Sequence, residues 1–231
     1  MNSRDEKADL RTRIIDFFTK FRTPLIVIMA VIIVGLIAFF VGSEVRESRL
    51  QSSLELVEEV EADFQEWTSL EAGTDESAAS AEEIMGAISE VVDRYPRSYA
   101  AQRALFIRGS LHFEQESWEA SASSFESVAE RFPESHLAPV ALANAAAARE
   151  EAGDEDAAAT LWRRVVDDYG QDAAETARAL FSLGRIAEGG GEFSEAAVYY
   201  NRLLDDFPGS SWTNLARNRI IYLTTEELIG S

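Results

Sequence analysis

The chain has 231 residues, 21 basic and 41 acidic, a formal net charge of −20, and no cysteine. The missing cysteine excludes disulfides, thiolate metal sites and cysteine catalysis, so an ordinary hydrophobic core must hold the fold. Such an acidic chain repels nucleic acid and anionic lipid headgroups, which excludes nucleic acid as a partner.

Residues 1–23 form a short basic arm in which apolar and charged residues alternate. The apolar members are Ile14, Ile15, Phe17, Phe18 and Phe21, and the charged members are Arg11, Arg13, Asp16, Lys20 and Arg22. This pattern predicts a short interfacial helix that lies on the membrane. Contact with a membrane partner is the alternative interpretation.

Residues 24–42 are predicted to form one transmembrane helix. Residues 25–42 carry no charge, and 13 of these 18 residues are Leu, Ile, Val or Phe. At ~1.5 Å per residue they reach ~27 Å, enough to cross a hydrocarbon core. A cleaved signal peptide is the alternative, because Val41, Gly42 and Ser43 loosely resemble a cleavage site. The apolar run exceeds the usual ~7–15 residues of a signal peptide, which favours a retained anchor.

The flanking charges predict the topology. Six of the 21 basic residues precede the span, whereas only Arg46 and Arg49 lie within the twenty residues after it. The positive-inside bias therefore places the N-terminus in the cytoplasm and the C-terminal domain outside, as in a single-pass protein of a cell inner membrane with a periplasmic or other extracytoplasmic domain. The exported part has 15 basic and 37 acidic residues, net −22, which favours solubility and tolerates basic partners.

Residues 43–98 are predicted to contain a linker helix and a degenerate first repeat. Ser48–Leu70 continues the helix from the membrane, Ala72–Ala81 is rich in small and polar residues and is predicted to be a loop, and Ala81–Tyr95 has the pattern of a second helix.

Residues 99–231 contain an internal repeat and a C-terminal capping helix, Trp212–Ile229. Similar three-residue motifs end successive predicted helices at intervals of 37, 37 and 38 residues: Arg94-Tyr95-Pro96, Arg131-Phe132-Pro133, Asp168-Tyr169-Gly170 and Asp206-Phe207-Pro208. Pro or Gly ends each helix. The full units are Gln102–Ser135, Pro139–Asp172 and Ala177–Ser210.

Three positions of each unit predict how its two helices pack. The eighth is small (Gly109, Ala146, Gly184), the twentieth is small (Ser121, Ala158, Ala196), and the twenty-fourth is large (Phe125, Trp162, Tyr200). Small residues allow a close helix approach, and the large residue fills the space between. Each pair leaves an apolar face for the next pair, so we predict an all-α fold in which one transmembrane helix precedes an α-solenoid of helix pairs.

These positions, the closing proline and the 34-residue unit resemble tetratricopeptide repeats (TPRs) over Gln102–Ser210. The chain departs from that pattern at position eleven, usually Tyr, which is His112, Arg149 and Ala187, and at Gly170, which replaces the closing proline. The resemblance implies a concave surface formed by positions two, five, nine and twelve of the first helices, here called the inner face.

The inner face is the candidate peptide-binding groove. The residues predicted to carry it are Arg103, Phe106, Ser110, Phe113, Arg178, Phe181, Arg185 and Arg219. The same positions include Val140, Ala143, Ala147, Glu150, Glu188 and, in the cap, Leu223. Aromatic and arginine side chains together suit an extended or partly unfolded polypeptide. The alternative is that Phe106, Phe113 and Phe181 only pack between helices.

No catalytic, cofactor or metal site is predicted, so the chain is not expected to be an enzyme. His112 and His136 lack metal-ligand spacing. The Gly189–Gly191 and Asp154–Asp156 stretches occupy turns and lack the phosphate-loop and EF-hand patterns. Asp167-Asp168 and Asp205-Asp206 recur at one repeat position as a helix-end charge pattern.

The layout also resembles the ancillary subunit of the bacterial Sec translocon: a short arm with Phe17-Phe18, one span, then TPR-like repeats. That resemblance implies a chaperone-like protein that binds the translocon and newly exported polypeptides. The stretch from Tyr95 and Pro96 through Ala101 to Gly109 resembles envelope-assembly proteins instead. It implies the alternative, a scaffold for an outer-membrane assembly or cell-division complex.

Overall fold

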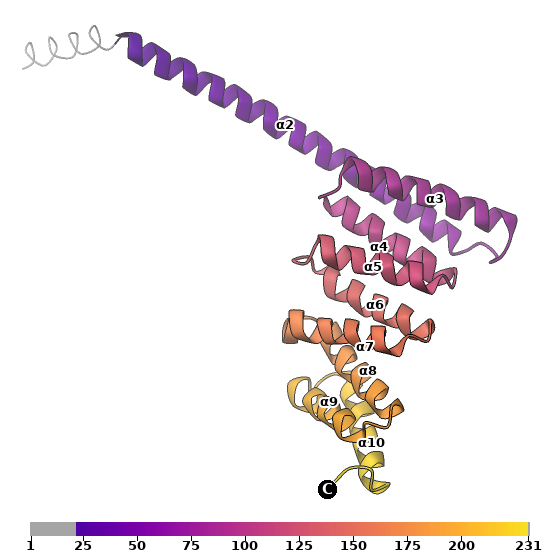
Figure 1. Cartoon of the computed structure of the whole chain (residues 1–231). Helices are drawn as coiled ribbons and strands as arrows, with labels where there is room; N and C mark the ends of the chain where they lie inside the picture. Colours follow the sequence, from indigo (N-terminus) through magenta and orange to yellow (C-terminus); the bar gives the residue numbers. More distant parts are fainter. Residues whose placement is uncertain (1–21, 231) are drawn as a thin grey trace, which may run out of the picture. The chain divides into compact units, whose positions relative to one another are not determined.

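The described residues, 22–230 of the computed structural model, contain helices and no strand, which confirms the all-α prediction for this range (Figure 1). The chain divides into two compact units, Met1–Ser52 and Ser53–Ser231, and each is described by itself. The basic arm predicted to lie on the membrane falls outside the described residues.

The first unit contains the start of helix α2 (Arg22–Trp67). This helix has a stretch long and apolar enough to cross a membrane, with a mean hydropathy of 2.0 and no buried residue in its most apolar window. Phe39 and Phe40, for example, are 70% and 67% exposed. A run of exposed apolar side chains is unfavourable in water, so this stretch has the character of a membrane anchor or a signal sequence.

The second unit begins with a helix pair. Residues 53–67 of α2 pack against α3 (Asp75–Arg94), and Trp67 and Ile84 belong to one apolar cluster. The Trp67 indole Nε1 donates a hydrogen bond of 2.9 Å to the carbonyl of Ser77. The pair therefore has the contacts of a repeat unit, although its first helix is the end of a much longer one.

The predicted loop over Ala72–Ala81 is wrong for most of its length, because α3 begins at Asp75. The Thr74 hydroxyl accepts a hydrogen bond of 3.2 Å from the Ser77 amide and caps the helix. Asp75 and Glu76 in the first turn favour a helix N-terminus. The small residues that suggested a loop lie on a helix, and Ala81 is buried in the core of the pair.

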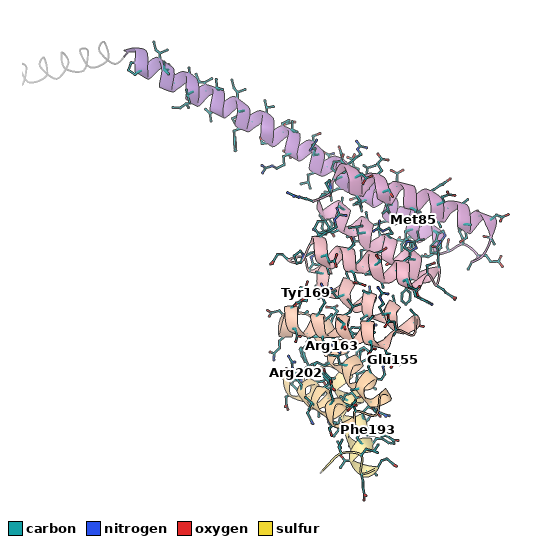
Figure 2. All side chains as sticks on the ribbon, viewed as in Figure 1. Met85, Glu155, Arg163, Tyr169, Phe193 and Arg202 are labelled. Atoms are coloured by element: carbon teal, nitrogen blue, oxygen red, sulfur yellow. The ribbon has the colours of Figure 1, made fainter. Side chains whose placement is uncertain are left out.

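Helices α4 to α10 follow in chain order, and each packs against its neighbours (Figure 1). Their bounds are α4 Tyr99–Glu114, α5 Trp118–Arg131, α6 Leu137–Glu151, α7 Glu155–Arg164, α8 Glu175–Gly189, α9 Phe193–Asp206 and α10 Ser211–Thr225. One buried apolar cluster runs from Leu105 to Leu223. The second helices present charged side chains such as Glu155, Arg163 and Arg202 to solvent (Figure 2).

The predicted packing of small against large residues is confirmed. A Cβ atom added at Gly109 would lie 2.7 Å from the Phe125 ring, and one added at Gly184 would overlap the Tyr200 ring. Ala146 replaces glycine in the second repeat unit, and it is fully buried. The first and second helices therefore approach most closely where the first helix carries its smallest residue.

The second repeat unit, Pro139–Asp172, ends differently from the other repeat units. Helix α7 stops at Arg164, a π-helical turn covers Val165–Tyr169, and a 3₁₀ turn covers Gly170–Asp172. Gly170 has φ 55°, in the left-handed region that favours glycine. The predicted stop at Gly170 is therefore correct, but the helix changes type before it.

Candidate functional site

The inner face is carried by α4, α6, α8 and α10. On α8, Arg178, Phe181 and Arg185 are spaced i, i+3 and i+7, so their side chains follow one stripe of the helix. Two of the four inner-face positions on α6 are alanines, and the expected groove position Ala143 is wrong, because this side chain is only 1% exposed. The aromatic and arginine side chains predicted for the groove lie on α4, α8 and α10.

On α4 the predicted aromatic residues pack partly within the stack. The Phe106 ring meets the Phe125 ring edge-on with centroids 5.0 Å apart, and Phe113 meets Trp118 in the same way at 4.9 Å. Ser110 donates its hydroxyl to the Phe106 carbonyl at 3.2 Å. Both phenylalanines are half-buried, so only part of each ring is open to a partner.

On α8, Phe181 contacts two aromatic rings and borders a hollow. Its centroid lies 5.8 Å from that of Tyr200 and 5.4 Å from that of Trp212. The hollow has a volume of about 410 Å³ and is lined by Phe181, Arg185, Glu188, Gly189, Tyr200 and Arg219. The structure thus brings three of the predicted residues, Phe181, Arg185 and Arg219, to one place.

Three of the four predicted arginines form ion pairs with carboxylates of neighbouring first helices. The pairs are Arg103 with Glu61 at 2.6 Å, Arg185 with Glu150, and Arg219 with Glu188. Each pair joins a helix to the first helix of the preceding unit. These arginines are therefore neutralised within the chain, which the sequence analysis did not foresee.

The carboxylates of Glu150 and Glu188 each receive a second hydrogen bond from an aromatic side chain of the same unit. The Trp162 indole donates to Glu150 at 2.7 Å, and the Tyr200 hydroxyl donates to Glu188 at 3.0 Å. Burial raises the pKa of Tyr200 to about 12, so its hydroxyl keeps the proton that it donates. The available sequence signal was a Glu twelve residues before Trp or Tyr in the second and third units.

The expected groove position Leu223 in the cap is wrong, because this side chain is fully buried. Thr176 and Thr213 each donate a side-chain hydrogen bond back to the end of the preceding helix, and they are 37 residues apart. Each repeat position in α10 therefore lies one residue earlier in the chain than the sequence analysis expected. Leu215 and Tyr222 take the inner-face positions of α10, and each is 46% exposed.

The residues weighed for catalysis have structural surroundings. Burial lowers the pKa of His112, and the neighbouring Arg108 lowers it further. Asp154 accepts a hydrogen bond of 3.1 Å from the Ala157 amide at the start of α7. Gly191, with φ 82°, turns the chain between α8 and α9. Within residues 22–230, no three His, Cys, Asp or Glu side chains are grouped as metal ligands.

Stacked helix pairs whose first helices share a line of mostly half-buried positions have the architecture of a helical-repeat module, a class that binds other proteins. The family model described as tetratricopeptide repeat matches residues 77–136 and 143–211, together more than half of the chain. The chain belongs to the tetratricopeptide repeat family. The first matched segment begins inside α3, so it includes part of the helix pair that the sequence marked as degenerate.

A TPR repeat-containing protein of Treponema pallidum is 30% identical over 114 residues. The match covers 49% of this chain and 47% of that protein, so the chain spans about half the length of this relative. The crystal structure of MamA aligns with 68% of this chain and 85% of its own, at 16% identity and a TM-score of 0.47.

Proposed function

We propose that the inner face binds extended or partly unfolded segments of other proteins. TPR repeats generally bind proteins, and the hollow beside Phe181 is the observation that carries the proposal. Phe181 and Tyr200 give it aromatic walls, and Leu215 and Tyr222 on the neighbouring α10 are exposed apolar side chains. Such a surface accepts apolar side chains from a polypeptide whose backbone remains extended.

The proposal includes a retained anchor. The apolar part of α2 fixes the chain in the inner membrane, the basic arm stays in the cytoplasm, and the repeats lie in the extracytoplasmic space. The charge difference across residues 24–42 supports this orientation. Reporter fusions before residue 24 and after residue 225 test it. Extracytoplasmic activity of the first fusion, or release of the repeats as a shorter soluble chain, would overturn the anchored topology.

Anchored in the inner membrane with its repeats outside the cytoplasm, the chain acts as a chaperone-like factor. It associates with the Sec translocon and receives newly exported proteins. Its layout of arm, span and repeats supports this assignment. The test is photo-crosslinking in living cells from position 222 on the inner face, with Val198 as the control because this α9 residue is 65% exposed. Many exported proteins together with translocon subunits are expected at position 222.

A fixed scaffold for a cell-envelope complex is the second candidate. It is favoured by the ion-paired arginines and the half-buried Phe106 and Phe113, because a preordered surface suits one defined partner. One dominant adduct in constant proportion would support the scaffold and contradict the chaperone-like role. Adducts from Val198 and none from position 222 would overturn the inner-face proposal as a whole.

A further inference from the structure

Arg178 differs from the other three arginines predicted for the groove. Among the described residues it has no carboxylate within ion-pairing distance, whereas Arg103, Arg185 and Arg219 each have one. Its guanidinium lies 5.1 Å from the centroid of the Trp162 ring. A cation held against an aromatic face keeps its outward donors available, so Arg178 is able to receive an external carboxylate.

Arg178 precedes Phe181 by three residues, which is ~4.5 Å along the helix axis. The hollow beside Phe181 contains two arginines, but Glu150 and Glu188 balance their charges. A segment that enters it therefore meets aromatic rings and paired charges, an environment that suits a large apolar side chain more than a charged one. The two neighbouring positions thus favour different chemistry.

The charge of the surrounding helices agrees with this division. Helix α10 has two arginines and no acidic residue, although residues 43–231 carry a net charge of −22. An acidic segment is repelled by most of this domain, but it is repelled less beside α8, where two arginines balance two glutamates, and beside α10. Charge complementarity therefore favours an acidic residue in the segment that binds here.

We propose that α8 and α10 select polypeptide segments in which a carboxylate lies two residues from a large apolar side chain. The carboxylate pairs with Arg178, and the apolar side chain enters the hollow beside Phe181. In an extended strand, side chains two residues apart project on the same side at ~6.8 Å, somewhat more than the ~5–6 Å between Cβ atoms three residues apart on a helix. This inference rests on the proposed function and names the sequence that the inner face prefers.

The experiment measures peptide binding by fluorescence anisotropy with the full chain in nanodiscs of neutral lipid, corrected with empty nanodiscs. The probes are Gly/Ser peptides of roughly ten residues, ~33 Å when extended, with blocked ends and one Phe. One probe has Asp two residues from the Phe, and the matched probe has Asn there. We expect the Asp probe to bind about tenfold more tightly, a typical difference for a charge-assisted hydrogen bond.

Three variants assign that preference. Arg178→Gln should bind both probes equally, and Arg178→Lys should keep part of the preference because it keeps the charge. Arg217→Gln is the control, since Arg217 is exposed, hydrogen-bonded to Asn214 at 3.0 Å and outside the inner face, and it should retain the full preference. Circular dichroism establishes that each variant is folded.

The outcomes separate this inference from the proposed function. Equal binding of both probes to the wild-type chain, or an unchanged preference in Arg178→Gln, overturns the role of Arg178 and leaves the inner face as a binding site. Loss of the preference in Arg217→Gln points to general charge attraction and also overturns it. Failure of every Phe probe to bind the wild-type chain contradicts the proposed function itself.

Discussion

The first and third repeat units close their two helices in the same way but surround the large residue differently. In both, a ring packs against a glycine of the first helix: Phe125 against Gly109, and Tyr200 against Gly184. Twelve residues before the ring, however, the first unit has Phe113 and the third has Glu188.

This one exchange changes what each unit presents. In the first unit, position twelve is an apolar ring that contacts Trp118. In the third, it is a carboxylate that joins Tyr200 and Arg219 beside the hollow. The packing residues thus specify the fold, while position twelve determines whether the end of the first helix presents an apolar ring or a carboxylate.

The strongest way to break the first unit is Phe125→Ala. The ring is 2% exposed and fills the space between α4 and α5, so its loss should reduce the free energy of unfolding by about 3–5 kcal/mol. Denaturant unfolding of the full chain, followed by circular dichroism, measures the change. Val198→Ala on the exposed face of α9 is the control and should change it by less than about 0.5 kcal/mol.

The close approach at the eighth position is tested by Gly184→Ala. The added methyl group overlaps the buried Tyr200 ring, and overpacking of this kind costs about 1–3 kcal/mol. Gly86→Ala is the matched control, because nothing lies within 4 Å of the added methyl group on α3. There the better helix propensity of alanine should stabilise by about 1 kcal/mol. Two equal effects would show that the glycine at position 184 is not needed for packing.

The sequence predicted the repeat stack because its determinants are local and periodic. Gly109, Phe125 and Gly184 recur at fixed positions, and their packing follows from size alone. The start of α3 was missed because its small residues lie on a helix that Thr74 caps and Trp67 covers. Packing across the pair outweighed a composition that is common in loops.

The inner face was less predictable because its chemistry depends on side chains from neighbouring units. The inner-face positions of Arg185 and Phe181 followed from the resemblance to TPRs, but the ion pair with Glu150 joins residues 35 apart. The positions assigned on α10 depended on the exact length of the last repeat. Counting one residue too many assigned the buried Leu223 to the inner face in place of the exposed Tyr222.

Tyr200→Phe gives the third repeat unit the same phenyl ring as the first and so isolates the contribution of the Tyr200 hydroxyl. The variant keeps the packing against Gly184 and loses the 3.0 Å hydrogen bond to Glu188, which should cost about 1 kcal/mol. Unfolding by urea measures it. A loss as large as that of Phe125→Ala would mean that the hydroxyl organises the whole third unit rather than one bond.

The turns between the paired helices provide a smaller test. The second and third units place glycine in the left-handed region, Gly153 at φ 76° and Gly191 at φ 82°, whereas the first unit has Glu116 at φ 56°. Glu116→Gly should remove this strain and stabilise the chain by about 0.5–1 kcal/mol. Thermal unfolding detects the shift, and a destabilised Glu116→Gly variant would show that the side chain makes a contact worth more than the strain.

The smallest expected effect is a pH dependence of the first unit. His112 on α4 has a folded pKa lowered by burial and by Arg108, against a hydrogen bond from Gln115 that raises it. As the pH falls through the ordinary histidine value of about 6.5, the unfolded chain takes up this proton first. The contribution of His112 is therefore full above that pH and is lost as the pH falls toward the folded pKa.

The measurement is the free energy of unfolding between about pH 7 and about pH 5 for wild type, His112→Gln and His136→Gln. The acidic surface titrates in all three, so only the difference between their slopes reports on one histidine. His112→Gln should lose less stability than the wild type as the pH falls, and His136→Gln, at an exposed position, is the matched control for replacing a histidine. Parallel curves for all three chains would mean that solvent reaches His112 well enough to cancel the effect of burial. In that case the stability of the first repeat unit would not depend on the protonation of His112.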